Sequence, residues 1–162
     1  MKITLIDNAK KKKIIECVLN LGIKKIHYLL LKSGHERIRA FSGDLSNDEL
    51  LKIWSILPIE GVGLYFGKEQ IDRKNGRREV RLSLDALHVL KEQISGNIVF
   101  LNEEQEEKWF AGKDIDLNEI NLRGFVAVFS EQDKDIIGTG KISADGKILF
   151  NYLPKERCRR GN

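Results

Sequence analysis

The spacing of apolar residues in the first part of the chain switches between a helical and a strand period. Apolar positions recur at three- and four-residue steps over residues 14–21, which predicts a helix that Gly22 ends. Residues 27–32 and 37–41 then read as two strands that the turn at residues 33–36 joins. The beginning of the chain therefore predicts a helix followed by a β-hairpin.

Helices and strands continue to alternate up to residue 95. Ser46 and Glu49 have the spacing of a capping box before an apolar run, which predicts a short helix that Pro58 ends. A strand, an Asn-Gly hairpin turn, a second strand and a helix are expected next, at residues 61–68, 74–77, 80–84 and 85–93. This order predicts a mixed α/β arrangement.

The pattern changes after Ser95-Gly96-Asn97 to short strands that tight turns join. A short acidic helix is expected at residues 103–112, and four strands are expected at residues 97–101, 122–130, 136–143 and 147–153. Such a series favours a small β-barrel. We therefore predict an α+β fold of two domains that pack against each other, an α+β domain at residues 1–95 and a β-barrel at residues 96–162.

The composition is typical of a folded protein with a heavily charged surface. Hydrophobic residues make up 41% of the 162 residues and charged residues 32%, which argues against a disordered chain. No apolar run approaches the roughly 18 residues of a membrane helix. The apolar stretch at residues 3–6 is too short for a signal peptide. We expect a cytoplasmic protein without a membrane partner.

The positive charge is unevenly distributed along the chain. The formal net charge is +4, and the excess of basic residues lies in residues 1–94 and 134–162. The densest clusters are the lysine run at residues 10–13 and the tail residues Lys155, Arg157, Arg159 and Arg160. Separated basic surfaces suggest a polyanionic partner, and the alternative is a solvated surface that binds nothing.

The sequence contains no recognisable catalytic motif. A phosphate-binding glycine loop and a nucleophile elbow are both missing from it. The three histidines do not have the spacing of metal ligands, and Cys17 and Cys158 stand outside any nucleophile motif. We therefore expect no enzyme activity, no metal and no cofactor.

Three motifs in the second part occur in a familiar order. The first motif is an aromatic-small-Gly turn at residues 108–115, at the end of the short helix. A Gly-hydrophobic-Val strand follows at residues 123–129, and a Gly-x-Gly strand at residues 136–141. Over about residues 96–155 the chain resembles a PUA domain, the RNA-binding module of pseudouridine synthases and archaeosine transglycosylases. The resemblance implies RNA contacts from the helix-to-glycine turn and from the glycine-containing strand.

Carried over by position, the resemblance and the basic tail give a set of expected RNA-binding residues. Glycines leave main-chain N–H groups accessible to phosphate or ribose, and neighbouring lysines neutralise phosphates. The alternative is that the glycines serve turns and bends of the barrel and the lysines are merely solvated. The expected residues are Lys108, Gly112, Lys113, Gly138, Gly140, Lys141, Lys155, Arg157, Arg159 and Arg160.

The first part shows a second resemblance. The Phe66-Gly67-Lys68 and Arg81-Leu82 elements are similar to the pre-PUA α/β domain of small archaeal and eukaryotic ribosome-biogenesis factors. Close relatives accompany Sun/Fmu-type RNA cytosine-C5 methyltransferases, whose catalytic cysteine and cofactor domain this chain lacks. Basic residues outside the PUA match either extend an RNA footprint or only add solubility; they are Lys10 to Lys13, Arg73, Lys74, Arg77 and Arg78.

These observations lead to one functional hypothesis and one alternative. The chain is expected to be a non-catalytic RNA-binding protein of ribosome biogenesis or of rRNA or tRNA modification. It would hold structured RNA, an rRNA or a tRNA, through contacts of the PUA domain with the phosphates and riboses of the RNA backbone. The alternative is a protein-interaction adaptor for an RNA methyltransferase or a pre-ribosomal protein.

Overall fold

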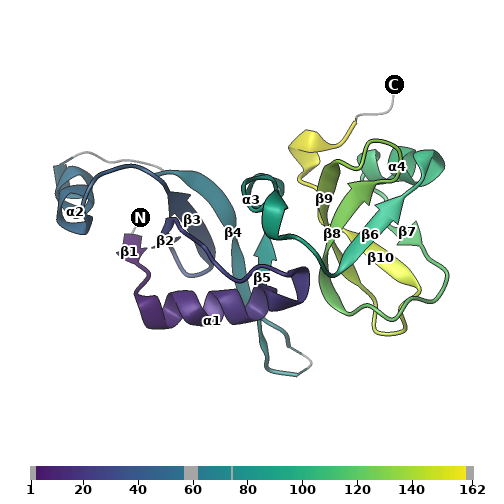
Figure 1. Cartoon of the computed structure of the whole chain (residues 1–162), viewed down its shortest axis with the longest axis horizontal. Helices are drawn as coiled ribbons and strands as arrows, with labels where there is room; N and C mark the ends of the chain where they lie inside the picture. Colours follow the sequence, from purple (N-terminus) through teal and green to yellow (C-terminus); the bar gives the residue numbers. More distant parts are fainter. Residues whose placement is uncertain (1–2, 57–61, 74, 160–162) are drawn as a thin grey trace.

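The computed structural model describes residues 3–56, 62–73 and 75–159 and shows a mixed α/β chain with two five-stranded sheets (Figure 1). In the first sheet the strands pair in chain order, each antiparallel to the next. These strands are β1 (Ile3–Leu5), β2 (Leu29–Ser33), β3 (Arg37–Phe41), β4 (Leu64–Ile71) and β5 (Arg78–Leu82).

Helix α1 (Asn8–Val18) packs on one face of the first sheet, because it buries Ile14 and Val18 against the inward-facing side chains of the strands. Asp7 accepts a hydrogen bond from the backbone N–H of Lys10 and caps the helix. The remaining helical segments of this part are the 3₁₀ helix η1 (Leu19–Leu21), α2 (Asn47–Ile56), α3 (Leu84–Val89) and the 3₁₀ helix η2 (Lys91–Gln93).

The second sheet has the order β6-β8-β9-β10-β7 and curls into a half-barrel (Figure 1). Strand β6 pairs parallel to β8, and the other neighbours are antiparallel. Trp109 at the end of α4 is fully buried in its core. The elements are β6 (Ile98–Leu101), α4 (Glu103–Phe110), β7 (Ile115–Asp116), β8 (Gly124–Ser130), β9 (Ile136–Ile142), β10 (Ile148–Asn151) and the 3₁₀ helix η3 (Lys155–Arg157).

The coarse prediction of a chain with mixed helices and strands is confirmed, and most expected elements lie within a few residues of the observed ones. Helix α1 begins at Asn8, six residues before the expected start, and so includes the lysine run. Strands β1 and β7 were not predicted, because three and two residues are too few to show a period. The expected helix end at Pro58 lies outside the described residues. The two sheets fall on either side of residue 95, and the division into two domains stays a prediction.

The two sheets are joined through α3 and β9 (Figure 1). Three residues of the second sheet, Ala127, Phe129 and Ile136, belong to the hydrophobic core of the first part. The buried Thr139 hydroxyl donates a hydrogen bond of 2.8 Å to the carbonyl oxygen of Leu82. A shared core and a buried polar contact fix the two parts relative to each other.

No helix in the described part of the chain is long and apolar enough to cross a bilayer.

Candidate nucleic-acid interface

A groove of about 590 Å³ lies between the first sheet and the segment that follows β10. Four of the side chains that line it are cationic, and one, Glu156, is acidic. Two tyrosines contribute aromatic surface. The cationic groove, as we call it, is formed by Arg37, Arg39, Tyr65, Arg81, Tyr152 and Lys155, together with Asn151, Leu153, Pro154 and Glu156.

The register of the first sheet explains why the arginines gather there. Ile38 and Ala40 of β3 are buried in the core on the α1 side, so the alternation of a strand turns Arg37 and Arg39 to the opposite face. Arg37 pairs with Lys68 of β4, and Lys68 pairs with Arg81 of β5. Three neighbouring strands thus carry a row of cations across this face.

The guanidinium of Arg39 is positioned by the loop before β4. Its Nε donates to the carbonyl oxygen of Val62 at 2.9 Å, and its Nη2 donates to that of Gly63 at 2.6 Å. Because neither partner is charged, these hydrogen bonds orient the guanidinium without neutralising it. Arg39 pairs with Tyr65 in the register, which places a phenol beside the fixed charge.

Tyr152 links the two sides of the groove. The guanidinium carbon of Arg81 lies 5.1 Å from the centre of the Tyr152 ring, within cation–π range. Phe125 packs edge-to-face with the same ring at 5.5 Å between centroids. A smaller cavity of about 120 Å³ shares Tyr65, Arg81 and Tyr152 and extends the groove toward Thr139.

The three arginines of the cationic groove have no acidic partner among the described residues. Within residues 3–56, 62–73 and 75–159, none of Arg37, Arg39 and Arg81 forms an ion pair with a carboxylate. Lys68 at the centre of the row does pair with Glu36, at 2.7 Å. The cationic groove therefore keeps a positive excess that an anion would neutralise.

The three glycines of the expected RNA site have different surroundings. Gly138 and Gly140 are buried, and a Cβ at Gly138 would lie 2.8 Å from the Trp109 ring. A Cβ at Gly140 would overlap Leu149. Packing within the half-barrel accounts for both strand glycines, and an RNA contact at either one stays a prediction. Gly112 is exposed and has a φ of +77°, which favours glycine after α4.

Most of the basic residues expected to bind RNA have partners within the chain. Lys141 pairs with Glu79 at 2.7 Å, so it joins the two sheets. Lys108 pairs with Glu104 one helical turn away, and this contact raises the pKa of the lysine. Pairing does not exclude RNA contact, but an RNA phosphate would have to compete with these carboxylates.

The tail residues also differ among themselves. Arg157 pairs with Asp85 at 2.8 Å, and Arg159 lies over the Phe110 ring at 5.1 Å. Lys155 lines the cationic groove, and Lys113 is exposed beside Gly112. Arg160 lies outside the described residues. Of the ten expected residues, Lys155 lines the cationic groove, and Gly138 and Arg157 line the smaller cavity that extends it.

The sequence analysis did not predict the groove residues of the first part as a binding site. The Arg37-Ile38-Arg39 alternation is visible in the sequence and predicts two arginines on one face of a strand. Nothing in the local sequence signals that Arg81 and Tyr152, which are 71 positions apart, meet across the junction. That meeting depends on how the two sheets pack.

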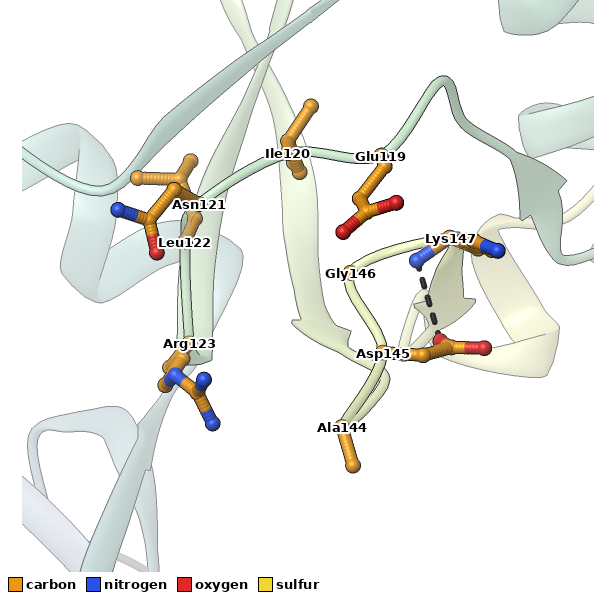
Figure 2. A pocket seen from close by; sticks show the side chains of 9 residues that line it. All are labelled: Glu119, Ile120, Asn121, Leu122, Arg123, Ala144, Asp145, Gly146 and Lys147. Atoms are coloured by element: carbon orange, nitrogen blue, oxygen red, sulfur yellow. Dashed lines mark hydrogen bonds between the residues drawn. The ribbon is translucent and has the colours of Figure 1, made fainter.

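A second surface pocket carries no comparable charge excess. A cavity of about 500 Å³ lies between the loop before β8 and the hairpin between β9 and β10. Figure 2 shows the residues that line it. Its charged side chains are Glu119, Arg123, Asp145 and Lys147, two of each sign. The dashed line in the figure joins the backbone nitrogen of Lys147 to Asp145, a contact that shapes the hairpin turn. Balanced charge gives this pocket no preference for an anion.

The described residues contain no group of three or more histidine, cysteine or acidic side chains arranged to hold a metal ion. Compared with known proteins, the chain matches no family model, and a search of curated proteins finds no match.

Proposed function

We propose that this chain is a non-catalytic RNA-binding protein that holds structured RNA, an rRNA or a tRNA, mainly by its sugar-phosphate backbone. It acts in ribosome biogenesis or in the modification of rRNA or tRNA. The observation that carries the proposal is the cationic groove, where Arg37, Arg39, Arg81 and Lys155 surround two tyrosines at the junction of the sheets.

The chemistry of the groove suits a nucleic acid. An arginine guanidinium matches the geometry of a phosphate with two parallel hydrogen bonds, and three such groups line the groove. Tyrosine rings and hydroxyls contact bases and ribose 2′-hydroxyls in RNA complexes. The groove thus supplies phosphate neutralisation and sugar or base contact on one surface.

The proposal includes the arrangement of a pre-PUA domain followed by a PUA domain. Its support is the order of motifs in residues 96–155 together with a curled second sheet that holds the helix-to-glycine turn at Gly112. In this arrangement the exposed Lys113 and the tail extend the RNA surface beyond the cationic groove. In this arrangement Lys141 stabilises the junction of the two sheets through Glu79 and does not contact the RNA.

A salt series with a matched control tests the proposal. Binding of a fluorescently labelled tRNA is measured by anisotropy for the unchanged chain and for Arg37→Gln/Arg81→Gln. We expect weaker binding and a logarithmic salt slope smaller by about 2, because each removed guanidinium leaves one phosphate with its counterion. The control is Arg123→Gln/Lys147→Gln at the pocket in Figure 2, which removes the same charge.

Two results would contradict the proposal. One is equal loss of affinity in both double variants, since the groove would then have no special part in binding. The other is the absence of binding to tRNA and to rRNA fragments at low salt, since phosphate contacts strengthen as salt falls.

The exposed apolar surface of α2 favours one alternative, an adaptor that docks an RNA methyltransferase or a pre-ribosomal protein. Leu51 is 45% exposed and Ile56 77%, and Leu45 just before the helix is 40% exposed. Exposed apolar clusters mark protein contacts more often than nucleic-acid contacts. An adaptor keeps its partner in a pull-down after nuclease treatment, and Leu51→Ser would release it.

A further inference from the structure

A second cationic cavity lies on the other face of the first sheet, beside α1. It has a volume of about 280 Å³. Its apolar floor is formed by Ile6 and Ile14, both of which belong to the core. Four basic side chains surround it: Lys10 and Lys13 from α1, Lys32 from β2 and Arg78 from β5.

Helix and sheet geometry bring these four residues together. Lys10 and Lys13 are three residues apart, so both side chains lie on one face of α1. Thr4 of β1 is the cross-strand partner of Lys32 and adds a hydroxyl to the rim. The lysines of the run at residues 10–13 therefore have different positions. Lys10 and Lys13 line the cavity, whereas Lys12 is exposed elsewhere on the helix.

Glu69 is the single carboxylate among the described residues that line the cavity, and it is held between Lys32 and Arg78. Lys32 Nζ lies 2.6 Å from it, and Arg78 contacts its other oxygen. Burial by itself would raise the pKa of Glu69, but the two cations outweigh burial and hold the pKa below its ordinary value. The carboxylate is therefore ionised at neutral pH. Lys10 pairs with Asp7 at 3.4 Å, whereas Lys13 forms no ion pair with a described carboxylate, so part of the surrounding charge stays without an acidic partner.

We propose that this cavity is a phosphate-binding site, in which Lys13, Lys32 and Arg78 contact the phosphate oxygens above the floor of Ile6 and Ile14. The phosphate is a monoester or diester group. It belongs either to an RNA strand or to a small phosphorylated ligand. The site stands on the opposite face of the sheet from the cationic groove, so it does not depend on the function proposed for the groove.

Two features favour a phosphate over other anions. The cavity is close to the lower end of the size range of small-molecule sites, which suits a compact group rather than a folded chain. Lys32 comes from β2 and Arg78 from β5, two strands that β3 and β4 separate, and Lys13 comes from the helix. The three donors therefore approach a tetrahedral group from different directions. A planar carboxylate ligand would leave one of these directions unused.

Amide NMR spectra of the full chain with sodium pyrophosphate test the site. We expect saturable shifts around Thr4, Lys13 and Arg78. Lys13→Ala weakens binding about fivefold, the equivalent of losing an exposed ion pair. The matched control Lys12→Ala removes the same charge from the same helix and leaves binding unchanged. Glu69→Gln removes the competing carboxylate and tightens binding.

The source of the phosphate follows from a second measurement on the same variants, the anisotropy of labelled tRNA. If Lys13→Ala weakens tRNA binding and Lys12→Ala does not, the phosphate belongs to RNA. If only pyrophosphate binding changes, it belongs to a small ligand.

The proposal is overturned if neither probe distinguishes Lys13→Ala from Lys12→Ala, or if Glu69→Gln fails to tighten binding of the probe that Lys13→Ala weakens. Failure of the groove proposal looks different, because it appears in Arg37→Gln/Arg81→Gln and leaves the Lys13 comparison intact.

Discussion

The three arginines of the cationic groove and the basic residues of the second part of the chain have different surroundings. Arg37, Arg39 and Arg81 line an open groove, and no described carboxylate pairs with them. In the second part, Lys141 and Arg157 are held by acidic residues of the first part. The part in which we predicted an RNA-binding domain thus uses much of its charge for internal contacts.

The difference shows that a positive charge indicates a binding surface only after its partners are known. Lys108 pairs with Glu104 on its own helix, whereas Arg39 is oriented by two neutral carbonyls. Both residues count equally in the net charge. They differ in the field that each presents to a ligand, because a neighbouring carboxylate cancels most of that field beyond a few ångströms.

The largest effect is expected for Gly138→Ala in β9. The added Cβ would lie 2.8 Å from the Trp109 ring, and Trp109 has no exposed surface through which to relax. Overpacking of this kind costs about 1–3 kcal/mol of unfolding free energy, measurable by denaturant titration. Unchanged stability together with a loss of RNA binding would instead show that Gly138 contacts the RNA. The second part of the chain would then contribute directly to binding.

A smaller loss of stability is expected for Lys141→Met at the junction. The side chains of Lys141 and Glu79 are 22% and 18% exposed, so water partly screens their ion pair and removal costs about 1–2 kcal/mol. The control is Lys91→Met, whose pair with Asp135 also joins the two parts but is far more exposed. Equal destabilisation in the two variants would show that Lys141 has no special role in the junction.

The pH dependence of stability sharpens the contrast between the two faces of the first sheet. The lowered pKa of Glu69 contributes stability that is complete above the ordinary value of 4.5 and is lost as the pH falls through the lowered pKa. Thermal melts of the unchanged chain between pH 7 and pH 3 should therefore decline more steeply than those of Glu69→Gln. Parallel curves would mean that Lys32 and Arg78 do not favour the charged carboxylate.

The smallest effect is expected for Lys108→Ala. This lysine is exposed and paired with Glu104, so its loss should leave the melting temperature unchanged and weaken tRNA binding less than Arg81→Gln does. A loss of affinity as large as that of Arg81→Gln would show that the main RNA-binding surface includes α4.

Local patterns were sufficient to predict most of the fold. The Ser46 and Glu49 capping box and the turn at Gly76 each depend on neighbouring residues, and the structure contains both. Strand β1 was not predicted because three residues are too few to show a period. Its position beside β2 depends on residues that lie far away in the sequence.

The candidate site was much less predictable than the fold. The alternation of Arg37 and Arg39 shows that both share a face, but not that this face stays open. Lys141 looked equally accessible in the sequence, and only the packing of β9 against the first part gives it an acidic partner. Ion pairs and grooves depend on tertiary contacts, which local sequence does not specify.

The contribution of Ala127, Phe129 and Ile136 to the core of the first part has a consequence during synthesis of the chain. A ribosome releases the residues of the first sheet and α3 well before Ile136. Until β8 and β9 emerge, the core of the first part lacks these three residues and is incomplete. Completion of the N-terminal fold therefore waits for the last third of translation.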